Sequence, residues 1–175
     1  VAAAAALTAD GPLEYMEQPC RTVPELAELR RRVDVPIAAD ESIRKADDPL
    51  HVVRSGAADV AVLKVAPLGG VRAMLDIAAQ IDIPIVVSSA LDSAVGIGSG
   101  LVAAGCLPRL PYACGLGTGG LFVEDVAEPV TPVDGYLPAV TGTPDRARLT
   151  ALAAPPERRQ WWIERVRTCF PLLPR

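Results

Sequence analysis

Short apolar runs alternate with amphipathic stretches along most of the chain. The runs have the length and composition of β-strands and cover residues 13–17, 36–40, 59–64 and 84–88, with a short fifth run at 112–115. The stretches between them carry apolar residues at helical spacing and predict helices over residues 23–33, 49–55, 70–81 and 93–105. Strands that alternate with helices and are apolar on both faces are typical of a parallel sheet. The pattern therefore predicts an α/β fold.

A polar residue or a glycine stands at the C-terminal end of each predicted strand. In chain order these residues are Glu17, Asp40, Lys64, Ser88 and Gly115, and successive members are 23, 24, 24 and 27 positions apart. Each interval is the length of one strand–helix unit, so the five residues fall at equivalent ends of neighbouring strands. Because parallel sheets and barrels collect their chemistry at this end, we expect a functional site there.

Three of these residues are charged and indicate a metal site beside an amine. Glu17 and Asp40 follow adjacent strands, and two carboxylates can bind one hard cation such as Mg²⁺, for which Mn²⁺ is a possible substitute. Lys64 closes the apolar run 60–63, where its amine can serve as a base or as a stabilising cation. Taken singly, each charge is explained as well by an ion pair at a strand end. The matched positions of all three favour the functional interpretation.

Hydroxyl and glycine residues near the ends of the last two strands are candidates for holding a substrate carboxylate. They are Ser88, Ser89, Ser93, Gly115, Gly117 and Thr118. Hydroxyl groups can donate hydrogen bonds to an anion, and glycine lets backbone N–H groups come close to it. The alternative is that residues 115–120 form a flexible loop that only leaves the last strand. No helical pattern follows directly, so this run is not a dinucleotide-binding fingerprint.

The alternation of strands and helices ends at Gly120. Residues 124–143 are rich in Pro, Gly, Val and Asp and predict extended connections, followed by helices over 144–153 and 157–169. We therefore divide the chain into strand–helix units over residues 1–120 and a C-terminal segment over residues 121–175 that covers the sheet or a neighbouring domain. Adjacent Trp161 and Trp162 point to different faces of the last helix, so at least one should pack outside that helix's own core side.

Composition and charge exclude several classes of protein. The chain of 175 residues has 17 basic and 21 acidic side chains, and its net charge of −4 argues against a general nucleic-acid binder, which needs a basic face. Hydrophobic residues make up 50% of the chain, which excludes wholesale disorder. No apolar run reaches the roughly 18 residues of a membrane span, and no signal peptide is recognisable. We expect a cytoplasmic protein whose partner is a small carboxylate, with no nucleic-acid or membrane partner.

The cysteine and histidine content argues against structural zinc. The four cysteines form no C-x-x-C pair, and the single histidine, His51, cannot complete a zinc ligand set. Free thiols in a reducing compartment are the simpler interpretation.

The runs around the strand ends resemble the enolase superfamily. They are YMEQP at residues 15–19, ADES at 39–42, VLKV at 62–65 and SSALDS at 88–93. Within the superfamily they are similar to the o-succinylbenzoate synthase family of menaquinone biosynthesis, in its actinobacterial type, and the run ACGLGTGG at 113–120 strengthens this narrower resemblance. The resemblance covers nearly the whole chain, and its motifs are specific in combination.

The resemblance implies a fold, a reaction and a role for each charged residue. The fold is a modified (β/α)₇β barrel with a capping domain, and this chain would supply approximately strands four to eight. Family members hold Mg²⁺ with three carboxylates, of which Glu17 and Asp40 match the second and third, and Lys64 matches the lysine after the sixth strand. The reaction is a lyase reaction, the dehydration of a cyclohexadiene carboxylate that carries a succinyl side chain.

Two family elements have no counterpart in this sequence. They are a Lys-x-Lys motif and the first metal carboxylate, and the chain starts in what looks like a helix already under way, so we expect it to begin inside a larger protein. Alone it should form an incomplete barrel that neither closes nor catalyses. Two alternatives remain open: another superfamily enzyme, of the acylamino-acid racemase or muconate cycloisomerase type, and a catalytically incomplete fragment that retains only the fold.

Overall fold

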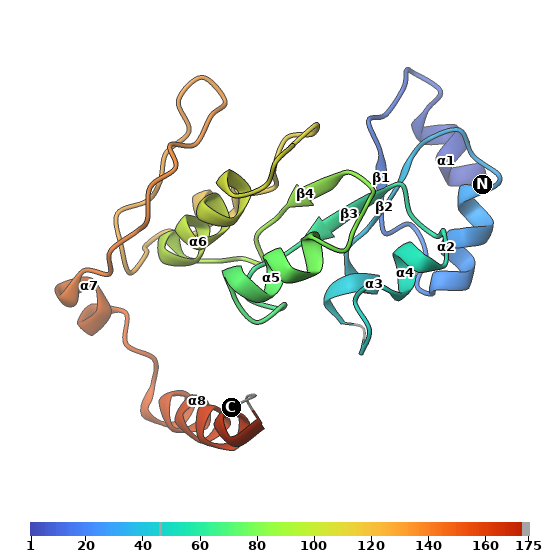
Figure 1. Cartoon of the computed structure of the whole chain (residues 1–175). Coiled ribbons are helices and arrows are strands. Elements are labelled where there is room, and N and C mark those ends of the chain that lie inside the picture. Colours follow the sequence, from blue (N-terminus) through green and yellow to red (C-terminus); the bar gives the residue numbers. More distant parts are fainter. Residues whose placement is uncertain (46, 173–175) are drawn as a thin grey trace.

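A four-stranded parallel sheet forms the centre of the computed structural model, which describes residues 1–45 and 47–172 (Figure 1). The strands follow one another in the order β1-β2-β3-β4. Their bounds are β1 (Met16–Glu17), β2 (Ile37–Ala39), β3 (Val60–Leu63) and β4 (Ile85–Val87). An isolated parallel bridge between Ser88 and Gly115 continues the sheet beyond β4. The predicted α/β fold with a parallel sheet is therefore confirmed.

Helices precede, connect and follow the four strands. In chain order they are α1 (Ala2–Leu7), α2 (Val23–Arg30), α3 (Glu41–Arg44), α4 (His51–Arg54), α5 (Val71–Ala78) and α6 (Ala94–Gly105). Thr22 begins α2 with a capping box, in which its hydroxyl accepts from the Glu25 N–H while the Glu25 carboxylate accepts from the Thr22 N–H. None of the helices in residues 1–45 and 47–172 is long and apolar enough to cross a membrane.

The two faces of the sheet bury different sets of side chains, because successive residues of a strand point to opposite faces. One face packs against the helices in the main core, whose members include Leu26, Ile37, Ile43, Val52, Leu63, Met74, Val87 and Leu101. The opposite face carries Ala38, Val60, Val62 and Val86, with Tyr15 and Tyr112 packed against them. We call this second face the inner face, since it would line the inside of a closed barrel. The two tyrosine rings meet there edge to face, with centroids 5.3 Å apart.

The small residues of α6 let an extended segment lie directly on that helix. A Cβ atom added at Gly98 would come within 2.9 Å of the backbone nitrogen of Gly142, and one added at Gly142 would come within 2.8 Å of the Ala94 carbonyl oxygen. Glycine is therefore required at both positions by close approach. The crossing ties the segment after Gly120 to the helix that follows β4.

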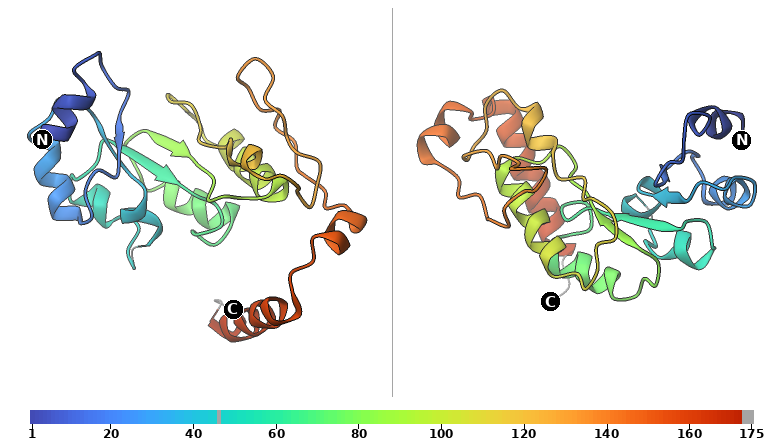
Figure 2. Two further views of the ribbon diagram at one scale, coloured as in Figure 1. Left: turned by 180° about the vertical axis from the view of Figure 1, so that it is seen from behind. Right: turned by 90° about the horizontal axis from the view of Figure 1, so that it is seen from above.

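The 3₁₀-helix η1 (Thr118–Leu121) leads into the C-terminal segment. That segment consists of a long irregular stretch, α7 (Arg146–Ala151), α8 (Pro156–Cys169) and the 3₁₀-helix η2 (Phe170–Leu172). In Figure 1 and the left view of Figure 2, α8 stands apart from the sheet. Its residues are exposed except for half-buried Ile163. Trp161 and Trp162 meet edge to face with centroids 4.7 Å apart, and Arg158 lies over the Trp161 ring. Packing of residues 121–175 on the barrel or a capping domain stays a prediction.

Several element boundaries differ from those expected. The first strand covers only Met16–Glu17 instead of residues 13–17, and Leu13 is exposed after Pro12. The expected fifth strand at 112–115 is reduced to the single bridge at Gly115, which follows the two prolines at 108 and 111. Helix α3, directly after Asp40, was not expected, because a four-residue helix leaves too little periodicity to recognise. The four cysteines are free, as expected.

Asp59, which immediately precedes β3, joins α2 to β2. Its carboxylate accepts hydrogen bonds from Arg30 Nε at 2.8 Å and from the Ile37 N–H at 2.9 Å. Burial alone would raise the pKa of Asp59, but these two hydrogen bonds outweigh it and hold the pKa below its ordinary value. A carboxylate with a lowered pKa stabilises the fold above its unfolded pKa, and this stability is lost as the pH falls through the folded value.

We expect Asp59→Asn to lower the free energy of unfolding by about 1.5–3 kcal/mol at neutral pH, the range for hydrogen bonds to a charged group. The difference from the parent should shrink as the pH falls through the lowered pKa of folded Asp59, where its carboxylate becomes protonated. Urea denaturation followed by circular dichroism at neutral pH and at a series of acidic pH values measures this. The exposed Asp76→Asn on α5 serves as the control and should leave the stability unchanged. A pH-independent loss in Asp59→Asn would contradict the electrostatic explanation.

Candidate active site

The alternation of side chains places the strand-end residues on the inner face. Ala38, Val62 and Val86 belong to the inner-face cluster, and Asp40, Lys64 and Ser88 each follow two residues later, so they point to the same side. Glu17 pairs in register with Ala38 and shares its face. The four polar residues therefore lie on one side of the sheet, at the C-terminal ends of adjacent strands. This is the arrangement that the spacing of 23 and 24 residues predicted.

Asp40 and Lys64 form a buried ion pair. Lys64 Nζ lies 2.6 Å from Asp40 Oδ2, and the two side chains are 11% and 4% exposed. The other carboxylate oxygen, Asp40 Oδ1, accepts from Arg44 Nε at 3.0 Å. A buried charge is costly unless it is paired and hydrogen-bonded, and Asp40 is held at both oxygens. The pair fixes both functional groups at one point above the apolar inner face.

Glu17 stands next to this pair at the end of β1. Glu17 is exposed at the edge of the sheet, but neighbouring atoms partly desolvate its carboxylate. This desolvation, together with the negative charge of Asp40, raises the pKa of Glu17, while Lys64 acts in the opposite direction. The negative charge of Asp40 thus disfavours ionisation of Glu17, and a positive charge beside the two carboxylates would counter this effect. Glu17, Asp40 and Lys64 therefore lie close together, as the sequence predicts. The role of each residue stays a proposal.

Part of the predicted carboxylate-binding group is also brought together. Ser89 Oγ donates to the Gly115 carbonyl oxygen at 2.9 Å and lies 2.7 Å from Thr118 Oγ1. Ser88 Oγ lies 3.3 Å from the same Gly115 carbonyl oxygen, and a Cβ atom at Gly115 would come within 2.8 Å of Ser88 Oγ. Ser88, Ser89, Gly115 and Thr118 thus form one group beyond β4. Among the described residues, Ser93 and Gly117 make no hydrogen bond to it.

A model of the family described as "Enolase C-terminal domain-like" matches residues 1–144. This is well over half of the chain. The chain belongs to the enolase C-terminal domain-like family. The open parallel sheet with charged residues at its C-terminal edge is this family's domain in the present structure.

Two curated relatives of this enolase-type domain carry the same name. The chain is 76% identical to the o-succinylbenzoate synthase of Mycobacterium tuberculosis over 173 residues, which are 99% of this chain and 53% of the relative. It is also 76% identical to the protein of the same name from Mycobacterium ulcerans over 171 residues, which are 98% of this chain and 52% of the relative. The chain thus spans about half the length of the curated relatives it matches.

Solved structures of the same superfamily share the fold. The muconate lactonizing enzyme from Pseudomonas fluorescens, complexed with muconolactone, matches with a TM-score of 0.75 and 29% identity, over 86% of this chain and 43% of that one. The muconate lactonizing enzyme from Pseudomonas putida matches with a TM-score of 0.72 and 28% identity, over 83% of this chain and 44% of that one. The enolase-type domain therefore corresponds to less than half of each of these enzymes.

Enzymes of the enolase superfamily generally use a divalent metal ion. Within residues 1–45 and 47–172, no three His, Cys, Asp or Glu side chains gather closely enough to hold one. Glu17 and Asp40 nevertheless suit a hard cation, since both side chains offer only oxygen ligands. Desolvation first and the charge of Asp40 second raise the pKa of Glu17, and a bound cation would favour its ionised form. The residues present fit such an ion as two of its ligands, and water or substrate oxygen atoms would supply others.

Three residues near the site were not predicted from sequence. Arg44 reaches Asp40 from α3, and Gln18 makes hydrogen bonds to the backbone around Asp40. Asp125 is buried, and its Oδ2 accepts from the Ala94 N–H at 2.7 Å at the start of α6. Gln18 belongs to the run YMEQP at residues 15–19, so its position next to Glu17 could have identified it as a candidate site residue. Asp125 lies 31 residues from its partner in an irregular stretch, and no local pattern points to it.

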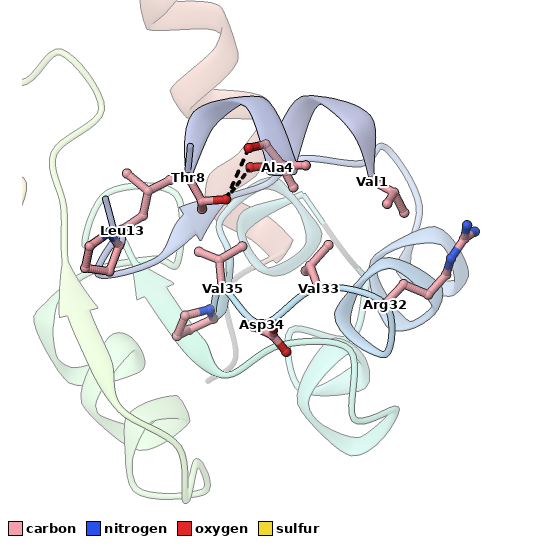
Figure 3. A pocket seen from close by; sticks show the side chains of 11 residues that line it. Val1, Ala4, Thr8, Leu13, Arg32, Val33, Asp34 and Val35 are labelled. Atoms are coloured by element: carbon pink, nitrogen blue, oxygen red, sulfur yellow. Dashed lines mark hydrogen bonds between the residues drawn. The ribbon is translucent and has the colours of Figure 1, made fainter. Parts of the chain in front are cut away.

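A pocket at the other end of the sheet is separate from these residues. Its volume is about 410 Å³, and it lies between α1 and the segment that precedes β2. Figure 3 shows Ala4, Thr8, Leu13, Val33 and Val35 among its lining side chains. Val35 lies before β2 whereas Asp40 lies after it, so the pocket belongs to the N-terminal edge of the strands. Chemistry in parallel α/β folds is expected at the opposite edge.

Proposed function

We propose that this chain is the catalytic C-terminal half of an o-succinylbenzoate synthase, a lyase of menaquinone biosynthesis. Its substrate would be 2-succinyl-6-hydroxy-2,4-cyclohexadiene-1-carboxylate, which loses water to give o-succinylbenzoate. The observation that carries the proposal is the buried pair of Lys64 and Asp40, next to Glu17, in a chain 76% identical to enzymes of that name. The small-molecule substrate, the cytoplasmic location and the absence of a nucleic-acid or membrane partner belong to the same proposal.

The difficult step of this reaction is removal of a proton next to a carboxylate. Mg²⁺, or Mn²⁺ in its place, would supply positive charge to the substrate carboxylate from a position held by Glu17 and Asp40. Lys64 Nζ stands beside Asp40 on the inner face, where it takes the proton as a neutral amine or stabilises the enediolate as a cation. Breaking the C–O bond then releases the hydroxyl group as water, with the proton supplied by a protonated group of the site, and the ring becomes aromatic.

The succinyl carboxylate would be held beyond β4. Ser88, Gly115 and Thr118 border the open end of the inner face, and Ser89 fixes Thr118 through the 2.7 Å hydroxyl contact. Ser93 precedes α6, and Gly117 follows in the same loop as Thr118. Hydroxyl and backbone N–H donors without an acid among them suit an anionic side chain. This favours the succinyl substrate over substrates with an amine.

We expect Gly117→Val to raise the KM for the cyclohexadiene substrate about tenfold, because the side chain would block close approach to the Gly117 N–H. A Cβ atom at Gly117 meets no atom within 4 Å and the backbone there has a negative φ, so the fold should tolerate the change. Steady-state kinetics and a melting curve measure the two effects separately. The matched control is Gly105→Ala, at the end of α6, where a Cβ atom also has open space. If Gly117→Val has the same KM as the parent protein, the loop that contains Gly117 does not contact the substrate.

A second candidate function is that of a muconate cycloisomerase. The observation that favours it is the structural match to muconate lactonizing enzymes with TM-scores of 0.72 and 0.75. The identity of 28–29% to those enzymes is far below the 76% to o-succinylbenzoate synthases. An acylamino-acid racemase would use the same metal and lysine positions, and a catalytically incomplete domain would use neither.

The proposed function is tested in the polypeptide that carries the whole barrel, which we call the complete protein. Loss of the cyclohexadiene substrate is followed by ultraviolet absorbance, with muconate and an N-succinyl amino acid offered in parallel. We expect rapid dehydration, its loss with a chelator and its return with Mg²⁺. Conversion of only one of the other substrates would replace the proposal by the corresponding alternative. Dehydration that persists without metal would contradict the role given to Glu17 and Asp40.

A further inference from the structure

Gln18, the residue after Glu17, connects the ends of β1 and β2 through its side-chain amide. Gln18 Oε1 accepts from the Asp40 N–H at 3.0 Å and from the Ser42 N–H at 3.1 Å. Gln18 Nε2 donates to Ser42 Oγ at 2.8 Å and to the Cys20 carbonyl oxygen at 2.9 Å. The oxygen accepts two bonds and the nitrogen donates two, so the full hydrogen-bonding capacity of the amide is used.

The backbone of Gln18 is held as firmly as its side chain. Its N–H donates to the Ala38 carbonyl oxygen at 2.8 Å, which extends the β1–β2 ladder by one residue. Its φ is +40°, an uncommon value for a residue other than glycine. Such a conformation persists where surrounding bonds determine it, and it turns the chain directly after Glu17.

The consequence is a fixed relation between the two carboxylates. Glu17 is covalently joined to Gln18, and the side-chain amide oxygen of Gln18 accepts a hydrogen bond from the Asp40 N–H. Arg44 and Lys64 hold the carboxylate of Asp40, whereas Gln18 is the side chain that ties its backbone to the neighbouring strand.

We propose that Gln18 is a positioning residue that sets the separation of the Glu17 and Asp40 carboxylates for one divalent cation. The inference rests on the proposed function, because it takes these two carboxylates as ligands. Gln18 itself touches neither the cation nor the substrate. Groups that orient metal ligands commonly change affinity or activity when they are replaced.

The test measures Mn²⁺ binding to the complete protein by electron paramagnetic resonance, without substrate. Gln18→Met keeps the length of the side chain and removes all four hydrogen bonds, and we expect its Kd for Mn²⁺ to rise about tenfold or more, as for other outer-shell partners. Ser42→Ala removes one of the four bonds and should give a smaller rise, about two- to fivefold on the same scale. Gln80→Met is the matched control, because Gln80 is exposed and lies far from the site, in the turn after α5, where its side-chain amide donates to the Asp76 carbonyl oxygen.

A role confined to stability would lower the melting temperature and leave the Kd of the folded protein unchanged. If folded Gln18→Met binds Mn²⁺ with the same Kd as the parent protein, the proposal is overturned. If circular dichroism shows that Gln18→Met does not fold, the test rests on Ser42→Ala. A Kd for Mn²⁺ in Ser42→Ala equal to that of the parent protein then overturns the proposal. Turnover at saturating Mg²⁺ should recover more fully in Gln18→Met than in a variant of Asp40.

Failure of the proposed function gives a different result. Parent protein that binds Mn²⁺ but leaves the cyclohexadiene substrate intact, together with a raised Kd in Gln18→Met, rejects the assigned reaction and retains the role of Gln18. Parent protein that dehydrates the substrate, together with an unchanged Kd in Gln18→Met, rejects the role of Gln18 alone.

Discussion

Replacement of Lys64 by Ala or by Arg should lower kcat of the complete protein on the order of 10²-fold or more, the scale for loss of a general base or of transition-state charge stabilisation. The ammonium lies 2.6 Å from Asp40 on the inner face, and the Lys64 side chain is only 11% exposed, so solvent cannot readily substitute for it. Arginine should fail as a base because it is not deprotonated in proteins, and its planar fork is bulkier than an ammonium.

The measurement is the dehydration rate at saturating substrate and metal, with circular dichroism to show that each variant folds. Lys45→Ala is the matched control, since Lys45 is an exposed lysine that follows α3 directly. Near-parent turnover in folded Lys64→Ala would make Lys64 a structural partner of Asp40, and the mechanistic proposal would be abandoned.

Asp40→Asn should weaken Mg²⁺ binding and lower turnover, each about 10²-fold or more, because loss of a ligand exceeds the 10–100-fold typical of outer-shell changes. The variant keeps the shape of the side chain but removes the charge that pairs with Lys64 and Arg44. Lys64 and Arg44 then lose the negative charge that balances their own, so we expect a moderate loss of stability together with the loss of activity.

Isothermal titration with Mg²⁺ and kinetics across a range of Mg²⁺ concentrations separate these effects. Asp76→Asn on the exposed side of α5 is the control, and it should match the parent in both measurements. Wild-type turnover of Asp40→Asn at limiting Mg²⁺ would show that Asp40 is not a metal ligand.

The order and orientation of the strands could be predicted from the sequence, because each buried strand is an uninterrupted apolar run. Val60–Leu63 is buried throughout and continues directly into Lys64, as its composition indicates. The edge of the sheet was less predictable, since Met16–Glu17 is short and partly exposed and depends on its pairing with β2. Short elements such as α3 are stabilised by contacts with distant residues, which no local pattern records.

The positions of the strand-end residues could be predicted for a different reason. They follow from the regular length of the strand–helix units together with the alternation of side chains along each strand. The interval of one strand–helix unit brings Glu17, Asp40 and Lys64 to one edge, and the two-residue alternation within strands turns them to one face. The partners that hold them were not predictable in this way. Gln18 reaches Ser42 across 24 residues, and Asp125 reaches Ala94 across 31, so each depends on the folded arrangement.

The central claim is that the carboxylates of Glu17 and Asp40 hold one divalent cation at the C-terminal edge of the sheet, beside Lys64. Anomalous diffraction from crystals of the complete protein soaked in Mn²⁺ tests this claim most directly. The account predicts one strong anomalous peak bonded to carboxylate oxygens of both Glu17 and Asp40, with Lys64 on the same face. A peak bound elsewhere, with the ion pair of Asp40 and Lys64 undisturbed, would contradict it.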